Sequence, residues 1–340
     1  MKYKDSGVNI SKANQTVKDI KKLVRSTYSK NVLSDIGTFG SIYSGKFSGY
    51  KNPVLVSSCD GVGTKVLLAE QVNFFDHLGE DIVNHSVNDI LAVGAKPLYF
   101  LDYIGMGKLD RSKVNTIISS MVKACKENSL SLVGGELAEM SDVYNFTHYD
   151  IVGFIVGICE KENIVTGKNI KVGDHILGLP SNGFHTNGYS LIRSIIKEKN
   201  LDIKKPLKNS KSPLFKELLK PHKSYLNEVY PLIEKKKVNG IAHITGGGFK
   251  DNIERILPQN VDAIIETSSW EVPNLFRNFC DIGNIGFDES YRVFNMGIGM
   301  VLIISEKNIS SVENFFKKIK IDYRRIGHIV SGKGNVSLLK

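Results

Sequence analysis

The sequence lacks the features of a disulfide-stabilised, secreted or membrane-spanning protein. Its 340 residues include only four cysteines, which are scattered and form no C-x-x-C pair. This argues against a disulfide framework or a structural zinc site and favours a reducing cytosol. The longest apolar stretch, at residues 296–304, is far shorter than the ~20 residues of a membrane helix. The polar first residues contain no apolar core of a secretory signal. We therefore expect a cytoplasmic protein with no membrane partner.

The composition is that of a globular protein with a basic balance. Hydrophobic residues make up 41% and charged residues 24% of the chain, and at ~150 residues per domain the length predicts two domains. Lysine and arginine number 45 against 35 acidic residues, a net charge of +10. The basic residues are spread in short runs such as 235–237, and no RNP or zinc-finger pattern is present. A lysine-rich background or an anionic substrate explains this charge better than nucleic acid.

Strand and helix patterns alternate along both halves, so we expect an α/β layer structure in each. The polar, turn-rich segment 160–173 predicts the boundary, with domains at 1–166 and 167–340. Apolar spacing predicts helices at 12–27, from about 64 onward, and at 80–93, 112–127, 187–199, 213–220, 223–237, 250–256, 271–281 and 309–319. Strands are expected at 54–58, 97–105, 130–134, 149–159, 175–179, 241–245, 261–267, 296–305 and 323–330.

Three carboxylates stand at expected element ends, each beside a glycine or an amide: Asp60, Asp89 and Glu136. Ligands favour the carboxyl ends of strands in α/β sheets. Mg²⁺ takes a few carboxylates and shares its other positions with phosphate and water. The three residues could therefore meet at one magnesium site. The alternative is that each is a helix cap or a solvated loop acid.

The stretch Asp60-Gly61-Val62-Gly63-Thr64-Lys65 follows an expected strand. It is not a P-loop, because its spacing and the order of Thr and Lys differ. Its glycines still allow backbone N–H groups to approach an anion, and Lys65 could add a point charge for phosphate. The alternative is an ordinary β-turn.

Two further glycine-bearing links lead from a strand into a helix. The triple glycine in 245–249 could form an anion nest, or merely a tight turn. The link at 180–190 carries His185, which could move a proton near neutral pH or be solvated. His243 could act similarly or be a core histidine. Lys21, on the expected first helix, could bind an anion or be solvated.

Taken together, these segments resemble the phosphoribosylformylglycinamidine cyclo-ligases (AIR synthetases) of purine biosynthesis. The resemblance runs nearly end to end. In the first half it rests on YKDSGV at 3–8, DGVGTK at 60–65, VNDI at 87–90, GAKPLYFLDY at 94–103, GKLD at 107–110, VGGELAEM at 133–140 and YDIVGF at 149–154. In the second half it rests on GFHTNGYS at 183–190, AHITGGGF at 242–249 and FNMGIGM at 294–300.

The resemblance implies a homodimer in which the strands of each N-terminal α/β domain join those of the partner in a shared barrel. A C-terminal α/β domain completes the active-site cleft. It also implies ATP, Mg²⁺ and the substrate formylglycinamidine ribonucleotide, whose formamide oxygen is phosphorylated before the imidazole ring closes. Phosphoryl transfer of this kind needs positioning and charge neutralisation.

On the matching motifs, the resemblance also implies residue roles. Metal ligands would be Asp60, Asp89 and Glu136. The nucleotide would also meet Gly61, Gly63, Thr64, Lys65, Gly134 and Gly135. Catalytic roles would fall to His185, His243 and Lys21, and substrate contacts to Asn187, Gly246, Gly247 and Gly248.

Four stretches depart from the family's usual pattern. The segment 34–40 is poor in glycine, and Leu137 stands where a threonine is usual. Residues 141–144 read SDVY instead of PGMY, and 220–222 read KPH where the family tends to have APT.

Two rival hypotheses remain. One is another ATP-dependent enzyme of the same superfamily. A selenophosphate synthetase would need a cysteine or selenocysteine near its start, whereas no cysteine precedes Cys59. Thiamine-phosphate kinases and the hydrogenase maturation relative do not share the full set of motifs. The other rival is a non-catalytic basic binder, which would lose affinity for nucleic acid steeply with salt.

Overall fold

The computed structural model describes residues 10–340, so the motif at 3–8 lies outside the described residues. The chain forms two compact units. The first comprises the described residues up to Ile90 together with Ala95–Lys161, and the second comprises Leu91–Gly94 together with Glu162–Lys340. Within residues 10–340, no helix is both long and apolar enough to cross a membrane.

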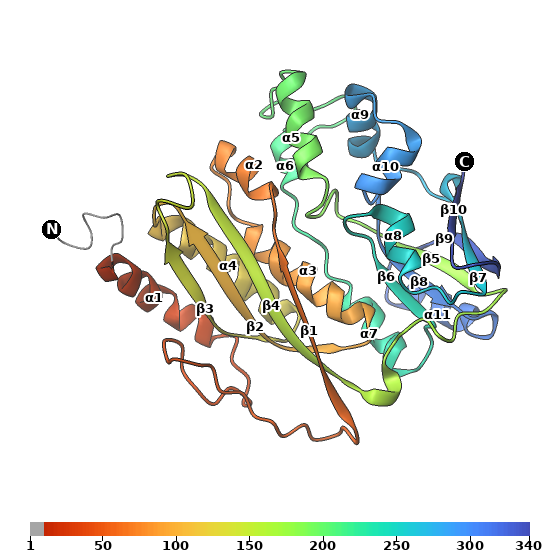
Figure 1. Ribbon diagram of the computed structural model, residues 1–340, viewed down its shortest axis with the longest axis horizontal. Coiled ribbons are helices and arrows are strands. Elements are labelled where there is room, and N and C mark those ends of the chain that lie inside the picture. Colours follow the sequence, from red (N-terminus) through yellow and green to blue (C-terminus); the bar gives the residue numbers. More distant parts are fainter. Residues whose placement is uncertain (1–9) are drawn as a thin grey trace. The chain divides into compact units, whose positions relative to one another are not determined.

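The first unit is a four-stranded sheet with helices on one face (Figure 1). Its elements are α1 (Ile10–Arg25), β1 (Pro53–Gly61), α2 (Lys65–Val72), α3 (Leu78–Ala92), β2 (Lys96–Met106), α4 (Arg111–Glu127), β3 (Ser131–Glu139) and β4 (Tyr149–Glu160). The strand order is β1-β4-β2-β3. β2 and β3 run parallel, and the other neighbours are antiparallel.

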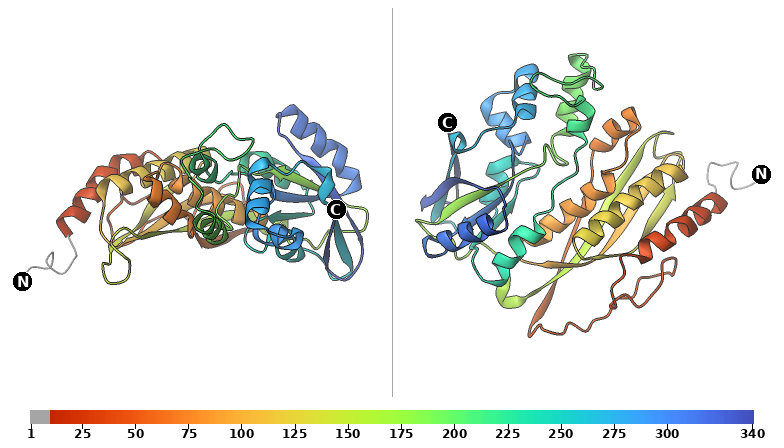
Figure 2. Two further views of the ribbon diagram at one scale, coloured as in Figure 1. Left: turned by 90° about the horizontal axis from the view of Figure 1, so that it is seen from above. Right: turned by 180° about the vertical axis from the view of Figure 1, so that it is seen from behind.

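Helices α3 and α4 cover the sheet from behind, as the rear view shows (Figure 2). Phe100 and Ile155 of the sheet and Ile82 and Ile117 of the helices are fully buried, and this apolar layer holds the unit together. α4 begins after Asp110, whose carboxylate accepts hydrogen bonds from the backbone N–H groups of Ser112 and Lys113, as helix N-caps do.

The other face of this sheet is not covered by the unit's helices. Its outward side chains include Leu55 and Phe154, which are 60% and 43% exposed. Side chains alternate between the two faces along a strand. Val152 and Val156, which are partly exposed, therefore share the open face with Phe154. The uncovered face of the sheet therefore carries several apolar side chains.

The second unit is a six-stranded sheet with order β10-β7-β9-β5-β8-β6. Its elements are β5 (His175–Pro180), α5 (Tyr189–Glu198), α6 (Leu214–Leu218), α7 (Leu226–Glu234), β6 (Gly240–His243), α8 (Gly248–Glu254), β7 (Val261–Glu266), α9 (Asn274–Gly283), α10 (Phe287–Val293), β8 (Ile298–Ile304), α11 (Glu306–Lys318), β9 (Arg324–Ser331) and β10 (Val336–Leu339). β8 is buried along its whole length, so both sides of the sheet are covered there.

The expected α/β class is confirmed in both units. Every expected helix and strand has a counterpart, but α10 and β10 were missed. β10 has four residues, too few for an alternating pattern to be read. Helix α7 begins at Leu226 rather than at 223. Residues 221–225 adopt neither helical nor strand conformation.

Candidate functional site

Two of the three carboxylates expected to bind metal lie together in the first unit. Asp60 is near the end of β1, and its Oδ2 lies 3.0 Å from Nε2 of His85 on α3. Asp89, one helical turn after His85, places Oδ2 3.7 Å from the same nitrogen. The Ser58 hydroxyl donates to Asp89 Oδ2 at 3.2 Å. β1 and α3 thus bring two carboxylates to one imidazole.

The two carboxylates affect the pKa of His85. Its burial would lower the pKa of the imidazole, but the hydrogen bond that His85 donates to Asp60 and the nearby charge of Asp89 raise that pKa above its ordinary value. Asp60 itself remains half exposed. The pair therefore offers hard oxygen ligands at the surface of the unit, of the type that Mg²⁺ takes.

The third expected carboxylate, Glu136, is not brought to the other two within the chain. β3 continues to Glu139, so Glu136 lies inside the strand and not at its end as expected. Glu136 of β3 pairs with Tyr103 of β2, and Tyr103 is aligned across β4 with Gly61 of β1. Asp60 precedes Gly61 and therefore belongs to the adjacent row of paired residues. Three strand spacings, about 14 Å, therefore separate Glu136 from Asp60. By alternation the two side chains leave opposite faces of the sheet.

Lys65 lies in the core of the first unit and not at its surface. Its side chain is fully buried, and Nζ lies 2.8 Å from Oδ1 of the equally buried Asp81. Burial lowers the pKa of Lys65, while the charge of Asp81 opposes that shift. In this conformation Lys65 anchors α2 to α3, and its expected contact with phosphate stays a prediction.

The rest of the 60–65 stretch keeps an open backbone. Gly63 adopts a φ of +69°, and no atom of residues 10–340 lies close to where a Cβ would stand, so glycine is needed there for conformation rather than for space. Gly61 is the last residue of β1. Thr64 occupies the N-cap position of α2 without a side-chain cap. These three residues form an open turn, and its contact with an anion stays a prediction.

A cavity of about 220 Å³ lies at the β3 edge of the first unit. Its wall includes Gly134, Gly135 and Glu136 of β3, Asp102 of β2 and the loop 35–41. Lys21 of α1 lies beside it, with Nζ 2.7 Å from Asp35 Oδ2, and Arg25 binds the same carboxylate. The glycine-poor loop is therefore tied to α1 through Asp35.

Asp102 stands out in this wall. Burial raises the pKa of its carboxyl group to about 7. The Gly135 backbone passes so close that a Cβ there would lie 2.4 Å from Asp102 Oδ1. Glycine at 135 thus leaves the space that the carboxyl group occupies.

We expect Asp102→Asn to make the protein more resistant to unfolding at alkaline pH. Between the ordinary aspartate pKa near 3.8 and about 7, the folded protein binds a proton that the unfolded chain has lost, so wild-type stability falls as pH rises. Asparagine does not titrate. The advantage of the variant in urea unfolding should be absent at pH 4, grow to pH 7 and then level off. A pH-independent difference would contradict the raised pKa.

The second unit gathers both expected histidines with a third that the sequence analysis did not select. His243 ends β6, His185 lies in the loop before α5, and His222 lies in the stretch before α7. The Nε2 atoms of His222 and His243 are 3.0 Å apart. The rings of His185 and His222 stack with centroids 4.0 Å apart.

Local packing explains the position of this cluster. Phe184 packs against Phe276 and Phe294 at centroid distances of 4.4 and 4.8 Å, which anchors the loop before His185. The Tyr225 hydroxyl donates to the Pro180 carbonyl at 2.9 Å and thereby holds the chain near His222. A side chain at Gly299 would meet both His185 and Tyr225.

The expected substrate residues also lie in the second unit, beside one another. A Cβ at Gly246 would stand 3.6 Å from Asn187 Oδ1, so the two glycine-bearing links meet. The amide nitrogen of Asn187 is buried and makes no hydrogen bond within the described part of the chain. Because such a group is costly to leave unsatisfied, it marks a place for a polar ligand.

The triple glycine is explained largely by backbone geometry. Gly247 and Gly248 have φ values of +91° and +63°. A Cβ at Gly248 would stand 1.9 Å from the Tyr291 carbonyl oxygen. The side-chain amide of Asn252 donates to the carbonyls of Gly246 and Gly248. The turn is therefore fixed without any ligand.

We expect Gly248→Ala to lower the free energy of unfolding by about 2 kcal/mol or more, from backbone strain and the clash with Tyr291. Gly246→Ala is the matched control, because its φ is ordinary and its Cβ would meet no atom closer than 3.6 Å. Urea unfolding should separate the two. Equal stability of both variants would show that the turn can relax.

Three residues of these sites had no place in the sequence-based selection. His85 could have been found from its i, i+4 spacing to Asp89 on a helix. His222 could have been noticed only as a departure from a family pattern, and Asp81 gave no signal beyond its position on a helix.

Comparison with known proteins identifies the family. The family model described as AIR synthase related protein, N-terminal domain, matches residues 49–159, and the corresponding C-terminal domain matches residues 171–340. A phosphoribosylformylglycinamidine cyclo-ligase of Caldicellulosiruptor bescii is 45% identical over 338 residues, which is 99% of both chains. Enzymes of that name from Alkaliphilus oremlandii and Neisseria meningitidis are 44% identical over 337 and 336 residues, with coverage of 97–99%.

Solved structures show the same fold at low identity. Thiamine-monophosphate kinase from Stenotrophomonas maltophilia matches with a TM-score of 0.69 and 14% identity, over 95% of each chain. Hydrogenase maturation protein HypE in complex with ATP matches with a TM-score of 0.69 and 17% identity, over 98% of this chain and 93% of the other. The two domain matches and the near-full-length identity to the curated relatives confirm the resemblance, and the chain belongs to the phosphoribosylformylglycinamidine cyclo-ligase family.

Proposed function

We propose that the chain catalyses the ATP-dependent cyclisation of formylglycinamidine ribonucleotide to 5-aminoimidazole ribonucleotide in purine biosynthesis. The formamide oxygen takes the γ-phosphoryl group of ATP and becomes part of a good leaving group. The amidine nitrogen that carries the ribose then attacks the formyl carbon, and phosphate leaves with the former formyl oxygen. The full-length similarity to enzymes named for this reaction is the observation that carries the proposal.

The first unit offers the groups that a nucleotide requires. Asp60 and Asp89 approach the same imidazole to 3.0 and 3.7 Å, and two such carboxylates fit the oxygen-ligand preference of Mg²⁺. When bound, the ion would neutralise phosphate charge. Lys21, beside the 35–41 loop, would supply further positive charge. The turn of Gly61, Gly63 and Thr64 and the wall of Gly134 and Gly135 would receive the nucleotide.

The second unit offers the groups that the ring closure requires. His185 and His243 are imidazoles suited to moving a proton near neutral pH. Asn187, whose buried amide nitrogen makes no hydrogen bond within residues 10–340, would bind a polar group of the substrate beside Gly246. Gly247 and Gly248 would contribute to substrate binding through the backbone conformation of this turn.

We also propose that the working form is a homodimer. The open face of the first sheet carries exposed Leu55 and Phe154, and a second copy of the same face would bury them, as the expected shared barrel requires. Glu136 leaves the sheet on this face. Its proposed role as a metal ligand therefore depends on pairing with the second copy.

The deciding experiment measures ATP turnover by the purified full chain with Mg²⁺, with and without formylglycinamidine ribonucleotide. ADP and aminoimidazole product should appear in equal amounts, and only with the substrate. With oxygen-18 in the formyl group, the label should pass into phosphate, because the formyl oxygen leaves on phosphorus. Unlabelled phosphate would overturn the phosphorylated intermediate.

A small-molecule kinase is the second candidate, favoured by the fold shared with thiamine-monophosphate kinase. ADP release without aminoimidazole would support it and contradict cyclisation. The absence of turnover with and without the substrate would contradict cyclisation.

A further inference from the structure

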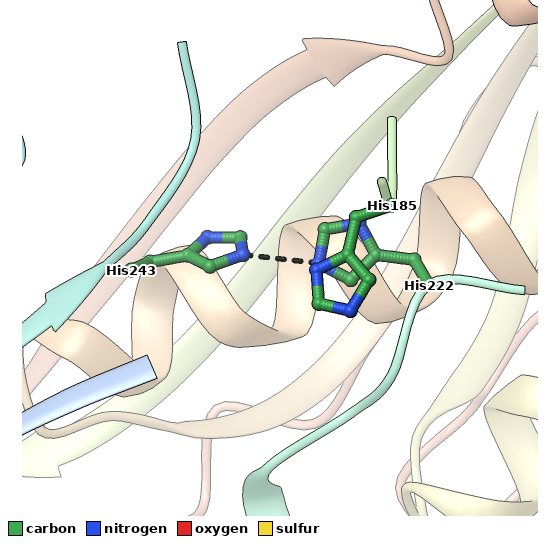
Figure 3. A group of neighbouring side chains, drawn as sticks. All are labelled: His185, His222 and His243. Carbon is green, nitrogen blue, oxygen red and sulfur yellow. Dashed lines mark hydrogen bonds between the residues drawn. The ribbon is translucent and has the colours of Figure 1, made fainter. Parts of the chain in front are cut away.

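We propose that His185, His222 and His243 form a binding site for a divalent transition-metal cation of the zinc class. The three imidazoles come from three separate segments of the second unit and are all buried. One nitrogen of each ring lies within 4.8 Å of the corresponding nitrogens of the other two. Figure 3 shows the three rings gathered together, with His243 facing His222 and His185 beside His222. Imidazole nitrogen suits Zn²⁺, Cu²⁺ and Ni²⁺, whereas Mg²⁺ takes oxygen.

The facing pair is close to the geometry of two metal ligands. The Nε2 atoms of His222 and His243 are 3.0 Å apart and share a hydrogen bond. Only one of the two nitrogens can hold the proton of that bond. In a tetrahedral zinc site with Zn–N bonds of 2.0–2.1 Å, ligand nitrogens are about 3.3 Å apart. A zinc ion could therefore replace the shared proton after a separation of a few tenths of an ångström.

The orientation of His222 is supported from its other side. Its Nδ1 lies 3.3 Å from the Thr186 hydroxyl oxygen. When Nδ1–H donates to that oxygen, the lone pair of Nε2 is directed towards His243. Metal-binding histidines characteristically donate their second nitrogen to such a partner, which fixes the tautomer and the ring.

His185 has to turn to become the third ligand. Its ring is stacked on His222, with 23° between the planes, and its Nε2 accepts a hydrogen bond of 3.1 Å from the Asn182 backbone. Two parallel rings cannot both point their lone pairs at one ion. Metal binding therefore exchanges the bond from Asn182 for a bond to the metal. Two ligands are preset, and rotation of the third completes the site.

The site has a consequence for catalysis that rests on the proposed function. A metal ion would occupy the lone pairs of His185 and His243, the two imidazoles proposed to move protons. Zinc is then an inhibitor of cyclisation in this chain. His222 stands in the 220–222 stretch that departs from the expected family pattern, so relatives without this histidine would lack the complete ligand set.

Binding is tested on the full chain, freed of metal by a chelator, with Zn²⁺ titrated against a coloured chelator. The wild type should bind one ion tightly. His222→Gln should bind it at least about 10-fold more weakly, a loss that even the removal of an outer partner of a ligand can cause. His328→Gln is the matched control, because His328 is half exposed and outside the cluster, and it should bind as the wild type does.

A second measurement needs no variant. X-ray absorption of the zinc-loaded wild type should show three imidazoles at about 2.0–2.1 Å. Fewer imidazoles, or equal affinity of the wild type and His222→Gln, would overturn the site. Zinc should inhibit aminoimidazole formation over the concentration range in which it binds. If zinc binds as expected while no cyclisation occurs without it, the proposed function fails and the metal site stands.

Discussion

Asp60→Asn is expected to lower turnover by at least about 100-fold, equivalent to roughly 3 kcal/mol of lost transition-state stabilisation. Asp60 is half exposed and near the end of β1, and it contributes one of the two carboxylates proposed to hold Mg²⁺. Asparagine keeps the size and one oxygen but loses the charge that the metal requires. Asp89→Asn should have a loss of the same order.

The fold should survive both substitutions. The hydrogen bond that His85 donates to Asp60 contributes to the raised pKa of His85. Its contribution to stability is fully present below the ordinary histidine pKa and is lost as pH rises through the raised value. Any stability loss in Asp60→Asn should therefore be seen at acidic pH. Turnover is best compared at alkaline pH, with circular dichroism as a check of folding.

Asp142→Asn provides the control. Asp142 is exposed, and the substitution removes the same charge at a position outside the Asp60–Asp89 pair. It should turn over like the wild type. If Asp60→Asn or Asp89→Asn kept the wild-type rate, that residue would be removed from the proposed metal site. A rise in the Mg²⁺ concentration needed for half-maximal rate would support the assignment further.

Asp81→Asn is expected to lower the free energy of unfolding by about 3–5 kcal/mol, because it leaves the Lys65 ammonium buried without its countercharge. Both side chains have no exposed surface, and the Nζ–Oδ1 distance is 2.8 Å. Lys65→Met should be similarly destabilising, since it removes the ammonium group that is ion-paired with the buried Asp81 carboxylate. Urea unfolding of the full chain, followed by circular dichroism, measures both.

The double variant Lys65→Met/Asp81→Leu distinguishes the removal of one charge of the ion pair from the removal of both charges. Apolar residues in both positions leave no buried charge, so the double variant should be more stable than either single variant. Asp202→Asn is the control at an exposed ion pair with Lys205, where a change within about 0.5 kcal/mol is expected. Unchanged stability of Asp81→Asn would show that Lys65 does not depend on Asp81. It would then leave Lys65 available for the predicted contact with phosphate.

The sequence alone determined the class of fold, the family and the order of the main elements. Helices and strands follow from local apolar periodicity, which is why α4 and β4 were predicted to within one residue at each end. The short strand β10 was not predicted, because four residues are too few to show an alternating pattern. The family was recognisable because its motifs are contiguous runs of residues, which can be identified without knowledge of three-dimensional contacts.

Only the tertiary structure decided which of these residues lie together. Spacing along the chain could not reveal that β1 and β3 are opposite edges of one sheet, and this strand order separates Glu136 from Asp60. Nor could it show that Lys65 points into the core, because a lysine in a glycine-rich turn is typical of phosphate sites. His222 joins His243 across 21 positions of sequence. Such contacts depend on how distant segments pack, and local patterns carry no information about that packing.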